Sequence, residues 1–507
     1  MLNKKIKSLK DISLISSKLK NKKKKIVLCH GVFDLMHNGH INHFHEAKKY
    51  GDVLIVSLTK DEFIKKGFNR PIFKIDERLS CIASLEIVNY VVTSPSESAE
   101  NVIKSIKPNY YVKGPDYKNL QKDKTKKIKL EKKAVTKYKG KIIFTKAPVQ
   151  SSSKLLFESE MIFSDNQKNF LNSVSKTINL NEIEEVLKKI SNLKVLVVGE
   201  TIIDKYTFCQ TIGKASKDPM LVVKKKEEQI YLGGASSIVQ NVKKLCKKVH
   251  FLSEVGSENT YKKFINNKLK NINKTLFINK KFSTIEKKRY IDQISNTKLL
   301  GLYNVEDAVY FKDKKSSINN FLKKKLKKFD VVIVSDYGHG LLNERSSKLL
   351  VKNSKFLFLN CQINANNKGN HLILKYKGAS NLIINETELR YEMRDDKSSV
   401  EELLKKFSNL YKINLIIVTR GSNGTILFDN KNKKLLKIPA FASKVIDKVG
   451  TGDIMLSVIA PFFSVSKNYA SGILAGSMFA SKSLKKFGNE NVLDASELTK
   501  FFSTFLK

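Results

Sequence analysis

The first 150 residues alternate short, wholly apolar runs with amphipathic segments. Helical spacing of the apolar positions predicts one helix over residues 6–19 and another over residues 41–50. Apolar runs predict buried strands at residues 26–29, 53–57, 110–113 and 141–144, and residues 85–92 predict a helix end followed by a further strand. Buried strands that alternate with helices are typical of a parallel, doubly wound sheet. The lysine-rich residues 118–139 are predicted to form an exposed helix or loop.

A second copy of this pattern begins near Leu193. Residues 158–190 contain no clear strand, and residues 181–190 predict a helix with glutamates toward its start, as the helix dipole favours. Further strands are predicted at residues 194–199, 331–335, 382–385 and 415–419. We therefore expect two α/β domains, over residues 1–157 and 192–507, joined by a helical connector over residues 158–191.

The formal net charge of +46 raises the possibility of a nucleic-acid-binding protein. Only seven of the 94 basic residues are arginines, however, and the lysines are spread along the chain. Because nucleic-acid readout favours arginine forks, a general bias toward lysine explains the charge better, and we expect no specific nucleic-acid partner. The positive charge would still attract sugar phosphates and nucleotides.

The cysteines and the apolar segments bear on the compartment. The five cysteines are an odd number and none are closely spaced, which argues against a disulfide framework or a metal knuckle and favours a reducing cytoplasm. The lysine-rich first 25 residues lack the apolar core of a signal peptide. The longest apolar stretch, residues 454–465, contains Pro461 and is too short to span a bilayer, so we expect no membrane insertion.

A glycine turn with two histidines follows the first predicted strand. Strand, glycine turn and helix together direct the amides of a helix N-terminus toward an anion. His37 and His40 lie at this turn, where imidazole N–H groups can hydrogen-bond phosphate oxygens, and Gly39 allows a phosphate to approach the backbone. The alternative is a pair of ordinary surface histidines, which the flanking strand and helix make less attractive.

The sequence from Gly31 to His40 resembles the signature of HIGH-type nucleotidyltransferases, in particular their cytidylyltransferase-like branch. Residues 70–71, 76–78, 112–117 and 151–154 resemble further motifs of that family, and Lys146 stands where the branch often has an arginine. The resemblance implies a Rossmann-like fold, catalytic roles for His37 and His40, and ATP or CTP as donor. The nucleotide contacts that it implies are Val32, Phe33, Asp34, Gly39, Lys66, Arg78, Lys113, Gly114, Asp116, Ser151, Ser152 and Ser153.

The second domain carries its most informative motif at residues 447–453, immediately before an apolar helix. A Gly-Thr-Gly turn before a helix can align backbone N–H groups as an anion hole. Asp453 at the helix start could then accept a proton from a substrate hydroxyl. The alternative is that Asp453 only caps the helix. Upstream, Asp204, Gly233, Gly234 and Asn241 could contact a polyhydroxyl ligand.

Residues 192–507 resemble the ribokinase-like carbohydrate kinases, whose hallmark is Asp-x-x-Gly-x-Gly-Asp. The resemblance implies a ribokinase-like fold, Asp453 as the base, and a sugar site of Asp204, Gly233, Gly234, Asn241 and Arg289. It implies that Asn385 and Glu388 act with Mg²⁺ and phosphate, with Glu388 as a metal contact through phosphate or water. The ATP contacts that it implies are Asn385, Glu388, Thr419, Gly421, Ser422, Gly424, Gly450, Thr451 and Gly452. Residues 360–369 lack the Asp-Pro-Lys-type loop found in heptose kinases.

Both halves together resemble the bifunctional heptose-7-phosphate kinase/heptose-1-phosphate nucleotidyltransferases of lipopolysaccharide precursor synthesis, with the order of the domains reversed. This resemblance implies Mg²⁺ as cofactor, sugar phosphates and nucleoside triphosphates as ligands, and a homodimer. Two alternatives stay open at this point. One is a nucleotidyltransferase with a degenerate, scaffolding kinase domain, and the other is a basic nucleic-acid-binding protein.

Overall fold

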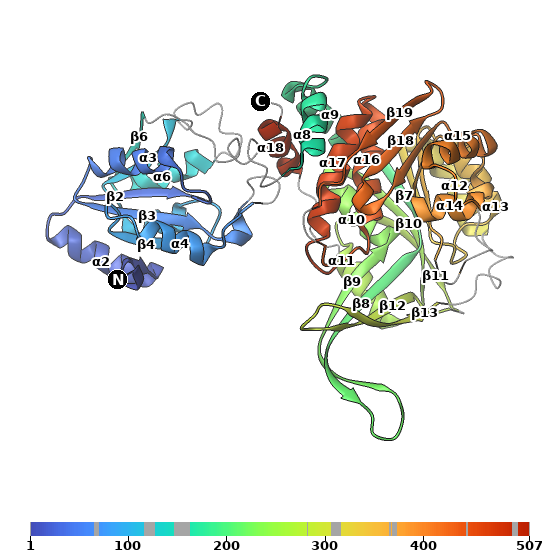
Figure 1. The fold of residues 1–507 in the computed structure, drawn as a ribbon, viewed down its shortest axis with the longest axis horizontal. Helices are drawn as coiled ribbons and strands as arrows, with labels where there is room; N and C mark the ends of the chain where they lie inside the picture. Colours follow the sequence, from blue (N-terminus) through green and yellow to red (C-terminus); the bar gives the residue numbers. More distant parts are fainter. Residues whose placement is uncertain are drawn as a thin grey trace. The chain divides into compact units, whose positions relative to one another are not determined.

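The computed structural model divides the chain into two compact units, Met1–Phe163 and Ser164–Lys507, and each is described here by itself (Figure 1). The structure describes residues 2–64, 70–115, 127–146, 163–280, 282–305, 316–364, 367, 373–442, 445–488 and 495–505. Within these ranges, no helix is both long enough and apolar enough to cross a membrane.

The first unit is a six-stranded parallel sheet with the order β1-β4-β3-β2-β5-β6, which confirms the doubly wound α/β prediction. Its strands are β1 (Ile6–Lys7), β2 (Ile26–Gly31), β3 (Val53–Thr59), β4 (Tyr90–Ser94), β5 (Tyr110–Lys113) and β6 (Lys141–Phe144). Its helices are α1 (Leu2–Lys5), α2 (Leu9–Asn21), α3 (Asn38–Lys48), α4 (Ile75–Ala83), α5 (Glu100–Ile106) and α6 (Lys127–Lys137), with a short 3₁₀ turn η1 (Asp61–Phe63). The order of the strands reverses between β2 and β5, and ligands bind at such a switch point in open α/β sheets.

Strand β2 shows why the central strands read as continuous apolar runs. Val27 and Cys29 pack into the core on one face of the sheet with Phe44, whereas Ile26 and Leu28 pack on the other face. Side chains alternate across a strand, so a strand covered by helices on both sides has to be apolar at every position. The one polar side chain of β2, His30, lies near the end of the strand, where its ring meets the hydroxyl of Ser57.

The second unit is built on a nine-stranded sheet with the order β11-β10-β7-β14-β15-β16-β17-β18-β19. The strands from β11 to β17 are parallel and the last two are antiparallel. Their bounds are β7 (Lys194–Gly199), β10 (Lys248–Gly256), β11 (Asn273–Asn279), β14 (Val331–Asp336), β15 (Leu357–Cys361), β16 (Asn381–Asn385), β17 (Leu415–Thr419), β18 (Thr425–Asp429) and β19 (Lys434–Ile438).

Along the chain, nine helices alternate with or follow the strands of this sheet within the described residues. They are α10 (Ala235–Leu245), α11 (Asn259–Lys268), α12 (Ser316–Lys325), α13 (Glu344–Asn353), α14 (Glu386–Met393), α15 (Val400–Tyr411), α16 (Thr451–Val465), α17 (Tyr469–Ser483) and α18 (Ala495–Phe505). Three short 3₁₀ turns are η5 (Leu326–Lys328), η6 (Ile373–Tyr376) and η7 (Gly421–Asn423). The predicted strand-to-helix alternation is therefore present in this unit too.

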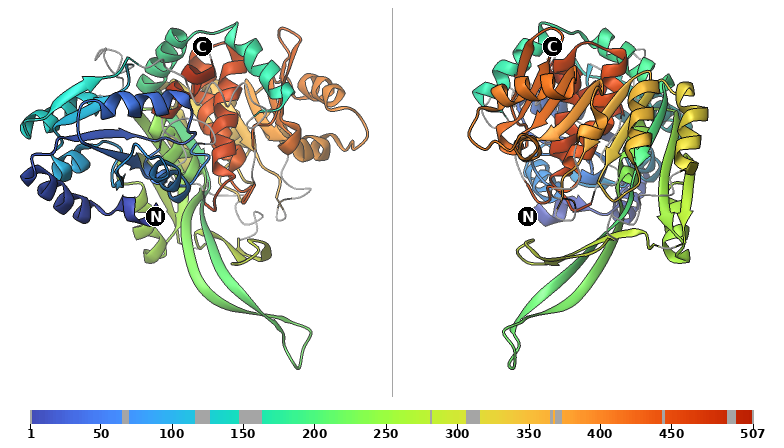
Figure 2. Two further views of the ribbon diagram at one scale, coloured as in Figure 1. Left: turned by 60° about the vertical axis from the view of Figure 1, so that its left-hand side comes forward. Right: turned by 90° about the vertical axis from the view of Figure 1, so that its right-hand side faces the viewer.

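A four-stranded sheet, in the order β13-β12-β8-β9, accompanies the large one. Its strands are β8 (Thr201–Lys214), β9 (Leu221–Gly234), β12 (Ile285–Asp292) and β13 (Lys298–Asn304). Strands β8 and β9 continue beyond this sheet as a long two-stranded arm (Figures 1 and 2). The sequence did not predict this sheet, because its strands mix charged and apolar residues instead of forming apolar runs.

Two helices occupy most of the segment that we expected to be a connector, α8 (Asp165–Ser175) and α9 (Leu180–Asn192). Both belong to the second compact unit, and α9 packs against α16 and α18. The apolar stripe of α9 is buried and consists of Ile183, Val186 and Ile190. We therefore propose that the second folding unit begins at Ser164, earlier than the expected start at residue 192.

This boundary can be tested with two truncated chains. We expect residues 164–507 to unfold cooperatively on their own, whereas residues 192–507 should aggregate or unfold at a lower urea concentration. The reason is that removing α9 exposes the apolar surfaces against which its stripe packs, and each buried aliphatic side chain contributes about 1.5–3 kcal/mol. Equal urea midpoints for the two chains would show that α9 is only a connector.

Candidate active sites

His37 and His40 lie together at the end of β2, where the order of the first sheet reverses. His37 is the N-cap of α3, and its Nδ1 accepts a hydrogen bond of 3.1 Å from the amide of Gly39. The neutral ring therefore carries its proton on Nε2. The two imidazoles stack with ring centroids 3.9 Å apart. The structure thus brings both predicted catalytic histidines to the N-terminus of one helix.

Phe33 packs its ring against the ring of His40. Its backbone is left-handed, with φ +47°, and its ring contacts that of His40 edge to face at a centroid distance of 5.4 Å. Gly31 precedes it because a Cβ at that position would crowd the Phe33 ring. Phe33, expected to contact the nucleotide, therefore packs beneath the turn and fixes its shape.

Asp34 was expected to contact the nucleotide, but its carboxylate is 2% exposed and faces the chain. It accepts backbone N–H groups of Ile72 (2.8 Å) and Phe73 (2.9 Å) and forms an ion pair with Arg70 (2.5 Å). These contacts fix the loop before α4. We assign Asp34 to positioning this loop.

The expectation for Arg78 also changes, because its side chain is 1% exposed and surrounded by acceptors. The guanidinium donates to the carbonyls of Val32 (2.6 Å), Phe73 (3.0 Å) and Thr59 (3.0 Å), and it pairs with Asp61 (2.5 Å). Arg78 thus connects α4, β3 and the residue after β2. The backbone of Val32 takes part in this clamp.

Lys113 ends β5 beside the histidine turn, and it is buried as well. Its ammonium forms an ion pair of 3.3 Å with Glu131, so its charge is balanced within the unit. Burial, followed by the charge of Lys113, lowers the pKa of nearby His43 to about 4 and keeps that ring neutral. Gly114 follows in open space, since a Cβ there would meet nothing within 4 Å. The remaining predicted nucleotide contacts, Lys66, Asp116, Ser151, Ser152 and Ser153, lie outside the described residues.

In the second unit, the predicted sugar residues meet where the two sheets join. Arg289 of β12 forms a buried ion pair of 2.6 Å with Asp204 of β8. A Cβ on Gly233 would overlap the second carboxylate oxygen of Asp204, so only glycine fits there. Asn241 of α10 is 3% exposed, and its Nδ2 makes no hydrogen bond to any residue that the structure describes. A buried amide of this kind suits a ligand oxygen.

Asp453 lies in the first turn of α16, beyond the Gly450 cap, whose φ is +77°. Its Oδ1 accepts a hydrogen bond of 2.7 Å from the hydroxyl of Tyr337. Burial raises the pKa of Asp453 to about 7, and the charge of Asp204 acts in the same direction. A carboxylate that titrates near neutrality is suited to accept a proton.

The turn before α16 is open at Gly452. A Cβ on Gly452 would meet no atom of the described residues within 4 Å, so its surroundings leave room for a ligand. Thr451 turns its hydroxyl away and donates it to the carbonyl of Lys448 (2.9 Å). The first turn of a helix offers backbone N–H groups to an anion.

The predicted ATP residues lie at neighbouring strand ends. Asn385 of β16 and Thr419 of β17 are register partners. Asn385 caps α14, and Glu388 completes a reciprocal capping box by accepting the Asn385 amide (2.9 Å). Burial, together with the charge of Asp453, raises the pKa of Glu388 to about 7. Gly421, with φ +57°, and exposed Ser422 form the turn that follows. Gly424 is required by geometry, because a Cβ there would overlap the carbonyl of Ile438.

Comparison with known proteins finds a family match for each unit. Residues 192–495 match the pfkB family of carbohydrate kinases. The chain belongs to this family. Residues 28–158 match the cytidylyltransferase-like family. The phosphofructokinase-2 of Escherichia coli has the same fold as the second unit, with a TM-score of 0.50, 11% identity, and coverage of 62% of this chain and 100% of that one.

Curated relatives of the chain carry the name bifunctional protein HldE, and two of them illustrate the extent of the match. The protein of Aliarcobacter butzleri is 46% identical over 117 residues, which are 23% of this chain and 25% of that protein. The protein of Campylobacter jejuni subsp. doylei is 32% identical over 278 residues, 53% of this chain and 56% of that protein. The chain thus matches about half, or less, of the length of these relatives.

Several residues of this pfkB-family site received no role from the sequence. Asp447, the first residue of the 447–453 motif, accepts hydrogen bonds from Tyr206 (2.8 Å) and Lys298 (2.6 Å). Strands β8 and β13 are thereby tied to the anion-hole turn. Tyr337 directly follows β14, and Lys287 lies among lysines on β12. For Tyr337, the available signal was a polar residue directly after the buried strand β14. Its partner, Asp453, lies 116 residues further along the chain and could not be identified from the sequence.

A substitution of Arg78 tests whether it positions the loop or binds the nucleotide. We expect Arg78→Met to reduce the free energy of unfolding of the first unit by about 3 kcal/mol or more, because buried carbonyls lose their donor. Hydrogen–deuterium exchange, resolved to peptides of β2 and β3, measures this loss. Arg345→Met is the control, because Arg345 lies at an exposed position of α13 and the same substitution there should leave the protection unchanged. Unchanged protection combined with weaker nucleotide binding would reverse the assignment.

Proposed function

We propose that the chain is a bifunctional enzyme that makes a nucleotide-activated sugar for surface polysaccharide such as lipopolysaccharide. The second unit would phosphorylate a sugar phosphate with ATP, with heptose 7-phosphate phosphorylated at its anomeric hydroxyl. The first unit would transfer a nucleotidyl group from ATP or CTP to a sugar 1-phosphate. The observation that supports this most is Asp453 at the helix start, where it accepts the Tyr337 hydroxyl and is close enough to Asp204 of the Asp204–Arg289 pair for that charge to act on its pKa.

The kinase reaction can be assigned to residues of the second unit. Asp204 and Asn241 would hold hydroxyls of the acceptor, and Asp453 would accept the proton of the reacting hydroxyl. The acceptor oxygen then forms a bond to the γ-phosphorus while the bond from that phosphorus to the bridging oxygen of ADP breaks. Backbone N–H groups at residues 450–452 would stabilise the charge on the transferred phosphoryl group.

Magnesium fits this chemistry. Glu388 offers oxygen, the ligand atom that Mg²⁺ prefers, and its carboxylate is oriented by the amides of Asn385 and Ile363 (3.3 Å). Because both oxygens already accept these bonds, we propose that Glu388 reaches the metal through water or phosphate. When bound, the ion would neutralise phosphate charge.

For the transferase reaction, the Nε2 proton of His37 and the ring of His40 would contact the phosphates of the donor. An oxygen of the sugar 1-phosphate would attack the α-phosphorus, and the bond to the pyrophosphate leaving group would break. The amides of the first turn of α3 would stabilise the charge of the phosphates. Gly39, Gly114, Lys66, Asp116 and residues 151–153 remain proposed contacts of the nucleotide.

Two other readings are less well supported. A scaffolding kinase domain would not need Asp453, yet this residue is present with an ordered hydrogen-bond partner. A nucleic-acid-binding role would call for exposed arginines, whereas Arg70, Arg78 and Arg289 pair with carboxylates inside the units.

We also propose a homodimer in the cytoplasm. The long β8–β9 arm carries exposed apolar side chains, including Ile212 at 65% exposure and Met220 at 57%, which a second copy could cover. Sedimentation velocity of the full chain tests this proposal, and a monomer at micromolar concentration would contradict it.

Asp453→Asn separates a base from a purely structural residue. The structure makes Gly450 the N-cap of α16, so the structural role left to Asp453 is to accept the Tyr337 hydroxyl; the asparagine oxygen can accept the same bond, and a structural role therefore predicts nearly normal kinase activity. As the base, Asp453 predicts a fall in kinase turnover of about 10²–10⁴-fold with ATP affinity little changed. ADP release with heptose 7-phosphate measures the turnover, and an unchanged urea unfolding midpoint of the second unit is the folding control. Near-normal phosphorylation would remove Asp453 from the mechanism.

His40→Ala tests the transferase site. We expect nucleotide-sugar formation to fall by about 10²-fold or more, which is the scale of losing one preorganised donor. Pyrophosphate release from a sugar 1-phosphate with ATP and with CTP measures the rate. An unchanged urea unfolding midpoint of the first unit shows that the variant is folded, and a wild-type rate of pyrophosphate release would contradict the assignment.

A further inference from the structure

Tyr337 is the first residue after β14, and its side chain reaches the carboxylate of Asp453. Its side chain is 4% exposed, and its hydroxyl donates a hydrogen bond of 2.7 Å to Oδ1 of Asp453. We propose that Tyr337 is a positioning residue for the kinase reaction, which holds Oδ1 of Asp453 so that Oδ2 faces the acceptor hydroxyl. This inference rests on the proposed kinase function and adds a residue that the sequence analysis left without a role.

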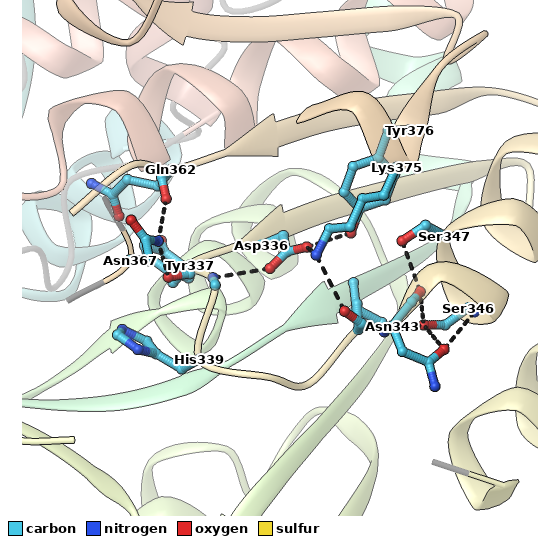
Figure 3. A network of polar contacts seen from close by, with 12 residues as sticks. Asp336, Tyr337, His339, Asn343, Ser346, Ser347, Gln362, Asn367, Lys375 and Tyr376 are labelled. Atoms are coloured by element: carbon cyan, nitrogen blue, oxygen red, sulfur yellow. Dashed lines mark hydrogen bonds and ion pairs between the residues drawn. The ribbon is translucent and has the colours of Figure 1, made fainter. Parts of the chain in front are cut away.

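The backbone of Tyr337 is held from two sides. Its amide donates to Glu200 at the end of β7 (3.0 Å), and its carbonyl accepts the side-chain amides of Asn364 (2.8 Å) and Asn367 (2.9 Å). Figure 3 shows Asn367 beside Tyr337, with Gln362 on the same loop. Three strand ends thus converge on one tyrosine.

Asn364 and Asn367 come from the segment that departs from the Asp-Pro-Lys-type loop of heptose kinases. Although this segment lacks the Asp-Pro-Lys-type sequence, its residues Asn364 and Asn367 still make defined contacts at the site. The described residues of the segment supply two amide donors to the Tyr337 carbonyl, and Asn367 also donates to the carbonyl of Gln362 (2.9 Å). The atypical loop thereby fixes the residue that orients Asp453.

The charged groups around Asp453 come from several elements. Asp204 of β8 and Glu388 of α14 are negative when ionised, whereas Lys287 of β12 is positive. The Lys287 ammonium lies over two rings, 5.7 Å from the centroid of Tyr303 and 5.8 Å from that of Tyr337. Among these neighbours, Tyr337 makes the direct hydrogen bond to Asp453.

A donated hydrogen bond stabilises the ionised carboxylate more than the protonated acid. The Tyr337 bond therefore lowers the pKa of Asp453, against the larger effect of burial, which raises it to about 7. Without this bond, the pKa of Asp453 would lie higher, and the base would be protonated over more of the neutral range.

The same network contains a matched control. Tyr376 is fully buried, and its hydroxyl donates a bond of 2.6 Å to another carboxylate, that of Asp336, which also pairs with Lys375 (2.6 Å; Figure 3). Tyr376→Phe therefore removes the same kind of buried tyrosine–aspartate bond without touching Asp453. A purely structural effect would appear in both variants.

The test is the pH profile of kcat/KM for heptose 7-phosphate with saturating ATP, measured on the full chain from about pH 5 to about pH 9. For Tyr337→Phe we expect the acidic midpoint to rise by about one to two pH units, the scale of losing a hydrogen bond to a charged group. At pH 7, kcat/KM should therefore fall about tenfold. Tyr376→Phe should keep the wild-type midpoint.

Replacing Tyr337 with 3-fluorotyrosine provides a second variant that keeps the side chain in place. The more acidic phenol donates a stronger bond, so the midpoint should move in the opposite direction, to lower pH. This variant decides the question if Tyr337→Phe does not fold. A wild-type midpoint in the fluorinated protein, or in folded Tyr337→Phe, would overturn the proposal.

A substrate-free measurement separates this inference from the proposed function. In pH-difference infrared spectra, the protonated-carboxyl band that is absent from Asp453→Asn reports the titration of Asp453 directly. Its midpoint should move upward in Tyr337→Phe and stay in place in Tyr376→Phe. If the wild type phosphorylates no acceptor but the band moves, the kinase proposal fails alone. A band that does not move, in an active enzyme, refutes the positioning role alone.

Discussion

Carboxylates at the carboxyl edge of the nine-stranded sheet have to be satisfied by donors, and this constraint determines the shape of the kinase site. Burying an ionised carboxylate without hydrogen bonds is far more costly than the few kcal/mol that separate folded from unfolded states. Glu200 accepts the amides of Tyr337 and His339, and Asp336 accepts Lys375 and Tyr376. Glu200 therefore fixes the loop that carries Tyr337, the residue that bonds Asp453, and Asp336 fixes the turn that carries Lys375 and Tyr376.

The same reasoning explains how much of the site could be predicted from the sequence. Buried parallel strands appear as apolar runs, and glycine turns before helices stand out between them, so His37 at the start of α3 and Asp453 at the start of α16 could be proposed from the sequence. What could not be predicted is which polar group each of them contacts. Arg289 meets Asp204 across 85 residues, and Tyr337 meets Asp453 across 116.

Arg78 and Asp34 show a second limit of the sequence, which is that it does not reveal whether a motif residue is exposed or buried. Their positions in the family motif suggested nucleotide contacts, but motif position does not reveal exposure. Only the folded chain shows that the carbonyls of Val32 and Thr59 surround the Arg78 guanidinium. The four-stranded sheet was missed for a related reason, because its strands carry charged residues among apolar ones and lose the apolar pattern.

The use of arginine in a lysine-rich chain fits this account. Five of the seven arginines form ion pairs with carboxylates in the described structure, and these are Arg70, Arg78, Arg289, Arg390 and Arg420. A planar guanidinium can satisfy several acceptors in a fixed geometry, which a lysine ammonium does not. Most of the arginines thus pair with carboxylates, and nearly all of the remaining positive charge is lysine.

The central claim is that one chain carries a sugar kinase and a sugar-phosphate nucleotidyltransferase. Mass-spectrometric identification of products tests it most directly, with the full chain incubated with heptose 7-phosphate and ATP, and separately with a heptose 1-phosphate and ATP or CTP. The account predicts a heptose bisphosphate in the first reaction and a nucleotide-linked heptose with one pyrophosphate per product in the second. Absence of a phosphorylated product from heptose 7-phosphate and from other sugar phosphates would contradict the claim for the kinase unit.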